Sequence, residues 1–243
     1  MTTLIAGVSG AIGCALAERY LERTDETVIG LCRQPETLPD RLRNHARLQL
    51  LPWRADVPDS LPGDSLAALL AEQLPLANVI YTAGLLHEDA MFPEKRLEDL
   101  QSHSMLKAFE VNCLGFGLLV QALAPHLRGQ HLKRVAAVSA KVGSITDNHL
   151  GGWYAYRCSK AALNMLVKNL SVELPRRFSP VACVALHPGT TRSALSEPFS
   201  QSLAKLTVHE PEETADNLYR VLQGLSEQDN GRFISWDGSD LPW

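Results

Sequence analysis

The sequence has little of what marks a secreted, metal-binding or nucleic-acid-binding protein. Its five cysteines are widely spread, with no Cys-x-x-Cys pair and no metal-ligand spacing to the eight histidines. We therefore expect neither a disulfide framework nor a metal site. No run of lysine and arginine occurs, and the formal net charge is -4, which argues against nucleic acid as a partner. Small molecules remain the expected ligands.

Long apolar runs and a basic leading segment are also missing. We see no hydrophobic run that approaches the roughly 20 residues of a membrane span, and the apolar first twenty residues lack the positive charges of a signal peptide. We therefore expect a cytoplasmic protein with no membrane partner. A chain of 243 residues with 45% hydrophobic and 21% charged residues can bury a full α/β core.

Short apolar strands alternate with helical patterns along the whole chain. Strands are expected at 4–6, 27–31, 47–51, 78–82, 134–139, 181–186 and 232–236, and helices at 14–21, 65–74, 104–127, 156–174 and 211–225. This alternation is typical of a parallel sheet covered by helices on both faces. We find no linker, repeat or low-complexity segment, and predict one Rossmann-type, doubly wound α/β domain over residues 1–243, with about seven strands.

A glycine-rich turn follows the first strand directly and leads into a helix. It reads Gly7-Val8-Ser9-Gly10-Ala11-Ile12-Gly13. Glycines let the backbone approach a pyrophosphate, and a helix N-terminus offers free N–H groups and positive potential. The turn is not of the G-x-G-x-x-G form, but its position favours phosphate binding over an ordinary tight turn. Ligands of a doubly wound sheet bind beyond the carboxyl ends of the strands, so the residues after the other strands are candidates too.

Tyr156 and Lys160 stand four residues apart on one predicted helix. That spacing places both side chains on one helix face. An ammonium near a phenol favours the phenolate and lowers the pKa of the tyrosine, so the pair can act as an acid/base unit. The alternative is a solvated helix face with a snorkelling lysine.

These motifs together resemble the short-chain dehydrogenase/reductase family over the whole chain. They are the Gly7 to Gly13 turn, Asp56-Val57, Ala83-Gly84, Asn112, Tyr156-x-x-x-Lys160 and Pro188-Gly189. Residues 151–157, 159–165 and 236–243 are similar to the branch that contains C-factor-type and sniffer-type carbonyl reductases. The resemblance implies an oxidoreductase that interconverts a small-molecule carbonyl and alcohol by hydride transfer. It also implies a homodimer or homotetramer, since the long helix and the Tyr156 helix commonly form the family's subunit interface.

The resemblance further implies a role for each site residue. Tyr156 donates the proton, Lys160 lowers the pKa of Tyr156 and binds the nicotinamide ribose, and Asn112 holds a water that links Lys160 to solvent. The implied contacts to NAD(P)H are Gly7, Ser9, Gly10, Ala11, Ile12 and Gly13 at the pyrophosphate, Asp56 at the adenine, Ala83 and Gly84 at the ribose and backbone, and Pro188, Gly189 and Thr191 at the nicotinamide amide.

The end of the second strand decides the expected cofactor. An acidic residue there would accept from the adenosine ribose hydroxyls and repel a 2′-phosphate. This chain has Cys32 in that place, followed by Arg33, whose guanidinium can form a bidentate pair with a phosphate. We therefore predict that NADP(H) is preferred over NAD(H). The alternative is that Arg33 is a plain surface charge.

The catalytic serine is the main departure from the family pattern. Where the family has Ser-Ser-x-x-Gly, this chain has Ser139-Ala140-Lys141-Val142-Gly143, which puts Ala140 in the catalytic place. We choose Ser139 for the role and keep Ser144 as the reserve. Loss of one such donor costs about 2 to 4 kcal/mol. A weakly active or inactive NADP-binding signalling protein on the same fold is therefore the alternative function.

Smaller departures concern a turn, a loop and two histidines. Ala11 stands where the family's turn has its middle glycine, and the 142–153 loop is longer than usual. That loop places Asp147, Asn148 and His149 either near the pocket or in a solvated turn. We expect His187 to be a core or strand-end residue and His87 to be exposed.

Overall fold

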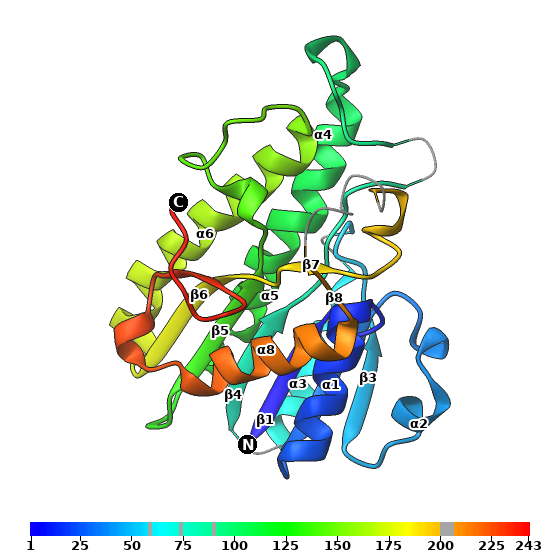
Figure 1. The fold of residues 1–243 in the computed structure, drawn as a ribbon. Helices are drawn as coiled ribbons and strands as arrows, with labels where there is room; N and C mark the ends of the chain where they lie inside the picture. The colour runs from blue at the N-terminus through cyan, green and yellow to red at the C-terminus, as the bar shows by residue number, and fades with distance from the viewer. Residues whose placement is uncertain (58–59, 73–74, 89–90, 200–206) are drawn as a thin grey trace.

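The computed structural model describes residues 1–57, 60–72, 75–88, 91–199 and 207–243. A seven-stranded sheet lies in the middle of the folded protein, with its strands in the order β3-β2-β1-β4-β5-β6-β9 (Figure 1). Every neighbouring pair in it is parallel. The strands are β1 (Thr2–Ala6), β2 (Thr27–Cys32), β3 (Leu48–Pro52), β4 (Leu76–Tyr81), β5 (Lys133–Val138), β6 (Val181–His187) and β9 (Phe233–Ser235). The predicted seven-stranded, doubly wound sheet is confirmed.

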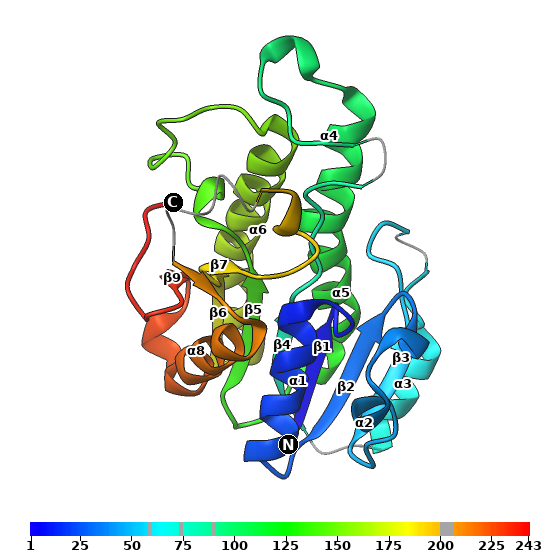
Figure 2. The same ribbon diagram turned by 45° about the vertical axis from the view of Figure 1, so that its right-hand side comes forward.

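Helices cover both faces of the sheet (Figure 2). Helices α1 (Ala11–Arg23) and α8 (Pro211–Gly224) lie side by side on one face, with the short α2 (Asp40–Arg43) near β2 and β3. The other face carries α3 (Gly63–Glu72), α4 (Ser102–Phe109), α5 (Gly115–Leu123) and α6 (Tyr154–Phe178). Each face therefore encloses its own apolar core.

The strands supply both cores at once. Side chains alternate along a strand, so Val135 and Ala137 of β5 join the core under α5 and α6, whereas Ala136 and Val138 join the core under α1 and α8. A strand buried on both sides has no need of polar alternation. This explains why the strands were recognisable in the sequence as short continuous apolar runs.

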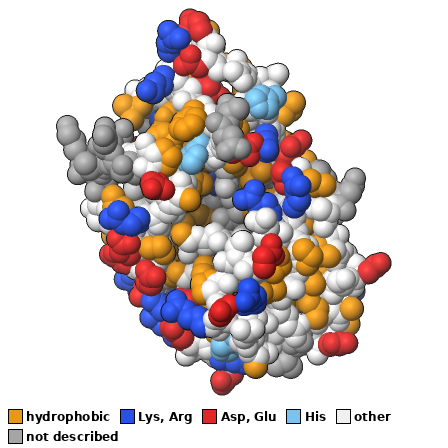
Figure 3. All heavy atoms as spheres, turned by 90° about the vertical axis from the view of Figure 1, so that its right-hand side faces the viewer, with side chains coloured by type: hydrophobic (Ala, Val, Ile, Leu, Met, Phe, Trp, Pro, Cys, Tyr) orange, Lys and Arg blue, Asp and Glu red, His pale blue; other side chains and the backbone are white. Residues whose placement is uncertain are grey.

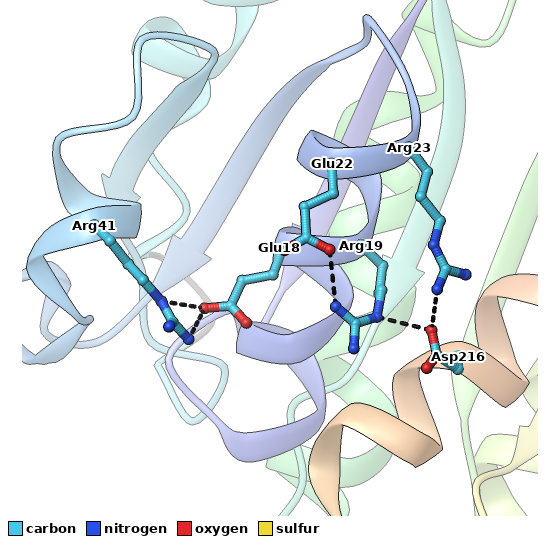
Figure 4. Close-up of polar contacts among 6 residues, drawn as sticks. All are labelled: Glu18, Arg19, Glu22, Arg23, Arg41 and Asp216. Carbon is cyan, nitrogen blue, oxygen red and sulfur yellow. Dashed lines mark hydrogen bonds and ion pairs between the residues drawn. The ribbon is translucent and has the colours of Figure 1, made fainter.

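Ion pairs join α8 and α2 to α1 on the outer surface (Figure 4). Asp216 Oδ1 lies 2.7 Å from Arg19 Nε and 2.5 Å from Arg23 Nη2, and Glu18 Oε1 lies 2.5 Å from Arg41 Nη2. Exposed pairs of this kind contribute only about 0 to 1 kcal/mol each. Apolar burial therefore provides most of the stability, and these pairs add weak polar contacts between the helices.

The expected 104–127 helix is interrupted. It begins at Ser102 and contains a π-helical turn, Glu110–Leu114, between α4 and α5. In that turn the N–H of Gly115 reaches the carbonyl of Glu110, five residues back. Single π turns inside α-helices frequently mark functional sites, and Asn112 lies in the middle of this one.

The same stretch corrects our expectation about apolar runs. Within the described residues, Ser102–His126 is long and apolar enough for a membrane span, with a mean hydropathy of 1.3. In its most apolar window, 44% is buried inside the protein, and Phe116, Leu119 and Leu123 pack into the core on the sheet. A core helix passes the same test of length and composition.

Other predicted boundaries shift by a few residues. The 156–174 helix begins at Tyr154 and continues through Pro175 to Phe178. The 65–74 helix begins at Gly63 and is described to Glu72, and its predicted end at Leu74 lies outside the described residues. A small parallel pair, β7 (Thr190–Thr191) with β8 (Val208–His209), was not predicted, because two-residue strands carry no periodic signal.

Candidate active site

A large pocket opens at the carboxyl ends of the strands. Its volume is about 1270 Å³, and the face in Figure 3 is hollowed near its centre, with hydrophobic side chains and Lys or Arg side chains around the hollow. Ligand pockets span roughly 300 to 1,000 Å³, so this one has room for an extended ligand. It brings together most of the predicted site: Gly7, Ser9, Gly10, Ala11, Ile12, Arg33, Asp56, Ala83, Gly84, Ser139, Tyr156, Lys160, Pro188, Gly189 and Thr191. Gly13 and Asn112 lie behind its surface.

The glycine turn after β1 is built by close backbone approach. Gly7 has a φ of +91°, and a Cβ there would lie 2.6 Å from Ala83 N. A Cβ on Gly13 would lie 2.3 Å from Gly7 O and 2.7 Å from Thr82 Oγ1. Gly13 thus serves the packing of α1 against the turn, in place of the ligand contact expected for it. Ala11 is the first residue of α1 and its methyl group lines the pocket.

A free guanidinium lies at the end of β2. Cys32 is buried, whereas Arg33 is exposed at the pocket, and no carboxylate of the described residues pairs with it. The nearby carboxylate of Asp56 is already engaged, because Arg54 Nη2 lies 2.8 Å from Asp56 Oδ2. The hydrogen bond from Arg54 lowers the pKa of Asp56. Arg33 is therefore available to an anionic ligand.

Tyr156 and Lys160 share the predicted face of α6. Lys160 Nζ lies 5.8 Å from the centroid of the Tyr156 ring and donates a 2.9 Å hydrogen bond to Val138 O. Burial lowers the pKa of Lys160 to about 8. Burial also raises the pKa of Tyr156, which is opposite to the lowering we expected from Lys160. Tyr156 therefore keeps its proton at neutral pH and is equipped to donate it.

Asn112 ties three elements together beneath the pocket. Its Oδ1 accepts from Leu85 N at 2.7 Å, and its Nδ2 donates to Leu85 O at 2.8 Å and to Ser159 Oγ at 2.9 Å. The residue is fully buried. Both amide hydrogens are used in these bonds, so the side chain has no N–H left for the water that we expected it to hold. Its observed role is to fix the loop after β4 against α6.

The hydroxyls of Ser139 and Ser144 are both engaged within the protein. Ser139 Oγ donates to Asn164 Oδ1 at 2.6 Å, and the residue is 2% exposed. Ser144 Oγ donates to Trp243 O at 3.2 Å and accepts from Asp147 N at 3.1 Å. The pocket surface beside Ser139 is formed by Ala140. A methyl group thus occupies the place where the family carries a polarising hydroxyl.

Aromatic rings gather at the other end of the pocket. The rings of Trp153 and Phe199 lie 5.0 Å apart, and the His87 ring lies 5.9 Å from Phe199. All three residues line the pocket together with Tyr156. His87 Nε2 lies 3.2 Å from the carbonyl oxygens of Ala194 and Leu195. The expectation that His87 is exposed was therefore wrong.

A family model described as short chain dehydrogenase matches residues 1–204. The chain belongs to the short-chain dehydrogenase family. It is 38% identical to the C-signal of Myxococcus xanthus over 148 residues. The matched region covers 60% of this chain and 83% of that protein. Its fold is similar to the carbonyl reductase Sniffer of D. melanogaster, with a TM-score of 0.86 and 25% identity over 100% of this chain and 99% of that one. It is also similar to the NADPH-bound carbonyl reductase from chicken fatty liver, with a TM-score of 0.84 and 26% identity over 100% and 94% of the two chains.

These likenesses confirm the predicted resemblance, including its C-factor-type and sniffer-type branch. As a short-chain dehydrogenase, the chain is an oxidoreductase of carbonyl and alcohol compounds, and small molecules are its substrates. Hydride transfer between such compounds needs a bound nicotinamide cofactor and a proton donor near the reacting oxygen. The glycine turn and Tyr156 line one pocket.

His187 is the last residue of β6 and so is the strand-end residue that we expected. The residue lines the pocket, and its Nδ1 accepts from Lys141 N at 3.3 Å. Burial, with a smaller effect from Lys141, lowers the pKa of His187 to about 4. The imidazole is therefore neutral and carries its proton on Nε2.

The long loop after β5 realises both alternatives that we considered for Asp147, Asn148 and His149. Asp147 lines the pocket and lies 3.6 Å from Lys141 Nζ. Asn148 Oδ1 accepts from Gly151 N at 3.1 Å and shapes the turn. Asn148 and His149 are exposed and do not line the pocket. Trp153 at the end of this loop and Phe199 are the residues that sequence reasoning missed here, and the Gly-Gly-Trp stretch was the signal for the first.

Proposed function

We propose that this chain is an NADP(H)-dependent carbonyl reductase in which Tyr156 passes its proton to the substrate oxygen. The observation that carries this proposal is the Tyr156 and Lys160 pair at the centre of the pocket, with Lys160 Nζ 5.8 Å from the tyrosine ring. A helix face exposed to solvent would not bury Lys160 to 3% exposure. The burial of that lysine is difficult to explain without a task for its charge.

The cofactor proposal rests on two ends of the same pocket. At one end Gly7 and Gly10 leave the backbone of the turn uncovered for a pyrophosphate, and the first N–H groups of α1 point out of the same turn. At the edge, unpaired Arg33 is suited to the 2′-phosphate that distinguishes NADP from NAD. The carbonyl reductase from chicken fatty liver, with 26% identity, was solved with NADPH bound. Asp56 would lie at the adenine, Ala83 and Gly84 at the ribose, and Pro188, Gly189 and Thr191 at the nicotinamide amide.

The protein's part of the reaction is proton transfer and orientation. Bound NADPH supplies the hydride that reduces the carbonyl carbon. Tyr156 supplies the proton that the carbonyl oxygen takes up. The ammonium of Lys160, held by Val138 O at 2.9 Å, stabilises the phenolate that remains. Asn112 holds the loop after β4 against helix α6, so that the hydride donor and the substrate carbonyl meet in one geometry.

Ser139 is the weakest member of the proposed catalytic set of Tyr156, Lys160, Ser139 and Asn112. Ser139 can polarise the substrate only if its hydroxyl leaves Asn164, to which it donates at 2.6 Å. Ala140 offers no hydroxyl of its own. We therefore propose a slow reductase, with Tyr156 as the main donor to the carbonyl oxygen and Ser139 as a secondary one.

Ala140 also favours a second function. An NADP-binding signalling protein needs the nucleotide site and no fast chemistry, and a methyl group in the catalytic serine position is compatible with that. The relative in Myxococcus xanthus is named C-signal. The complete Tyr156, Lys160 and Asn112 set supports the enzyme, because a sensor would have no use for a proton donor beside a buried lysine.

NADPH oxidation separates the two functions. Absorbance would be followed over a panel of aldehydes, ketones and quinones, with Tyr156→Phe as the control. The enzyme predicts turnover that this variant loses, whereas the sensor predicts NADPH binding without turnover across the whole panel. Equal rates in wild type and variant would refute Tyr156 as the proton donor.

We also propose a homodimer or homotetramer in the cytoplasm. The outward faces of α4 and α6 carry exposed apolar side chains, among them Leu106 at 64% and Met165 at 59% exposure. Exposed apolar groups on neighbouring helices suit a contact with a second copy. The five cysteines are all free, as expected in a reducing compartment.

A further inference from the structure

Three successive left-handed residues lead into helix α6. Gly151 and Gly152 have φ values of +64° and +63°, and Trp153 follows with a φ of 51° and a ψ of 43°. Glycine adopts this conformation easily, but a bulky side chain rarely does. Within the described residues, Trp153 is the one non-glycine residue with a positive φ. Such outliers persist where surrounding contacts enforce them, and they concentrate at functional sites.

Backbone and side-chain contacts from Glu94 and Arg157 hold this turn in place. Trp153 N donates to Glu94 O at 2.6 Å, and the buried Glu94 carboxylate accepts from Ala155 N at 3.2 Å. On the other side, Arg157 Nε donates to Gly151 O at 3.2 Å. The carboxylate also lies at the helix N-terminus, where the macrodipole favours negative charge. The unusual conformation of Trp153 is therefore imposed from both sides.

The turn places the indole of Trp153 beside the proton donor. Its ring centroid lies 6.2 Å from that of Tyr156 and 5.0 Å from that of Phe199. His87 continues the wall, 5.9 Å from Phe199. These rings come from the loop after β4, from α6 and its leading turn, and from the segment after β7. They form a pocket wall made of flat aromatic surfaces.

The cationic side chains at this end of the pocket already have partners within the protein. Lys107 Nζ lies 2.5 Å from Glu88 Oε1, and Lys141 Nζ lies 3.6 Å from Asp147 Oδ2. The guanidinium of Arg157 is used on backbone carbonyls. Lys160 is likewise used on a backbone carbonyl, Val138 O, so among the described lining residues Arg33 at the opposite end is the cation that has no hydrogen-bonded or ion-paired partner. The substrate end therefore suits a neutral compound.

We infer that Trp153 determines specificity at this end of the pocket, and that it selects a neutral compound whose carbonyl is joined to a flat aromatic ring. Aromatic rings attract one another in offset and edge-on arrangements at centroid distances of roughly 4.5 to 7 Å, beyond the burial of their area. A ring of the substrate stacked along Trp153 and Phe199 brings its carbonyl to the hydroxyl of Tyr156. This selectivity rests on the proposed function for its chemistry, but the binding of the ring needs no turnover.

A matched pair of ketones tests the specificity. Acetophenone and cyclohexyl methyl ketone share one carbon skeleton and differ in whether the ring is aromatic. Trp153→Gly removes the indole and keeps a residue that tolerates the left-handed turn. The ratio of kcat/KM for acetophenone to that for the saturated ketone should fall about fivefold in this variant. Trp153→Leu, which keeps an apolar side chain, should lower the same ratio, and Trp243→Leu, in a tryptophan outside the pocket, should leave it unchanged.

Saturation-transfer NMR on the NADP-loaded protein gives the second readout. The ring protons of acetophenone should receive saturation in wild type and much less in Trp153→Gly, while thermal melting shows that this variant is folded. If no ketone is turned over but this difference is present, the proposed function fails and the role of Trp153 stands. If turnover is present but the ketone ratio is the same in wild type and Trp153→Gly, the role of Trp153 is refuted and the reductase stands. An equal loss in Trp243→Leu would also refute it.

Discussion

The hydroxyl of Ser139 donates to Asn164 Oδ1 at 2.6 Å in the interior beneath α6. The serine that sequence reasoning chose for catalysis is therefore part of the packing between β5 and α6. Asn164 in turn donates to Gly143 O at 3.3 Å, so this small network also fixes the turn after β5. Ala140, the next residue, also lines the pocket and carries no hydroxyl.

Ala140→Ser should make the enzyme faster. The new hydroxyl would stand at the pocket surface, where a donor to the developing charge on the carbonyl oxygen is worth roughly 10²-fold in kcat. We expect at least a tenfold rise in kcat for ketones, about 1.4 kcal/mol, measured by NADPH oxidation under saturating cofactor. Ser139→Ala is the control. It should lower the melting temperature, because the buried Asn164 oxygen loses its donor, and it should change kcat far less. No gain in Ala140→Ser would show that a hydroxyl here does not reach the substrate.

Arg33→Ala should weaken NADPH selectively. Removal of a charge-assisted contact to a phosphate costs about 1.5 to 3 kcal/mol, so KM for NADPH should rise at least tenfold while KM for NADH stays within twofold. Steady-state kinetics with both cofactors measures this. Arg41→Ala removes an arginine that pairs with Glu18 outside the pocket, and both constants should be unaffected. Equal changes for the two cofactors would make Arg33 a plain surface charge.

The pH dependence should reveal Lys160. Because burial holds the pKa of Lys160 at about 8, its ammonium is present at pH 7 and is lost as pH rises through 8. The ratio kcat/KM for NADPH, which reports groups of the free enzyme, should therefore fall above pH 8. Over the same pH range, the free energy of unfolding should rise. Between the folded pKa of about 8 and the ordinary value of 10.5, the unfolded chain binds more protons, so this residue makes the folded state more stable as pH rises. A kcat/KM that is flat to pH 9.5 would contradict the assignment.

Gly13→Ala should destabilise the fold. The added Cβ would lie 2.3 Å from Gly7 O, and the backbone there cannot yield as a flexible side chain would. Overpacking of this kind costs about 1 to 3 kcal/mol, which urea unfolding can measure. Gly63→Ala is the matched control, since nothing lies within 4 Å of its Cβ position, and the loss of unfolded-state entropy should stabilise it by about 0.4 to 1 kcal/mol. Similar effects of the two variants would show that the turn is not tightly packed.

The association state should depend on the apolar face of α4 and α6. Wild type should sediment as a dimer or tetramer at micromolar concentration, and Leu106→Glu together with Met165→Glu should sediment as a monomer with an unchanged melting temperature of the subunit. Charges introduced at these exposed positions cost the monomer little but cannot be buried in an interface. A wild type that is monomeric would refute the proposed assembly.

The sheet and the Tyr156 and Lys160 face were predictable because they depend on local periods. A doubly buried strand such as β6 appears as a continuous apolar run, and a four-residue spacing on a helix fixes two side chains on one side. The π turn at Asn112 was not predictable in the same way, since Phe116, Leu119 and Leu123 still fall on the core side after it. The hydrophobic pattern therefore continues across the insertion.

The residues that the sequence did not reveal depend on contacts between distant segments. Trp153 faces Phe199 only because the backbone before α6 is left-handed. The predicted direction of the shift in the Tyr156 pKa was wrong for a related reason. A nearby ammonium lowers the pKa of a phenol, but burial raises it, and the depth of burial is a property of the assembled pocket.

The close approach of Gly7 to Ala83 has a consequence for how this enzyme can change. A Cβ on Gly7 would lie 2.6 Å from Ala83 N, and two residues further on Leu85 is held by Asn112, which also bonds Ser159 on α6. The Gly7 to Gly13 turn and helix α6 are thus connected through a continuous series of close backbone and side-chain contacts. Substitutions that move one part should alter the effect of substitutions in the other, because sites in direct contact are seldom additive. Affinity for the cofactor pyrophosphate and catalytic rate should therefore evolve together in this protein, and a change of one by itself should carry a cost in the other.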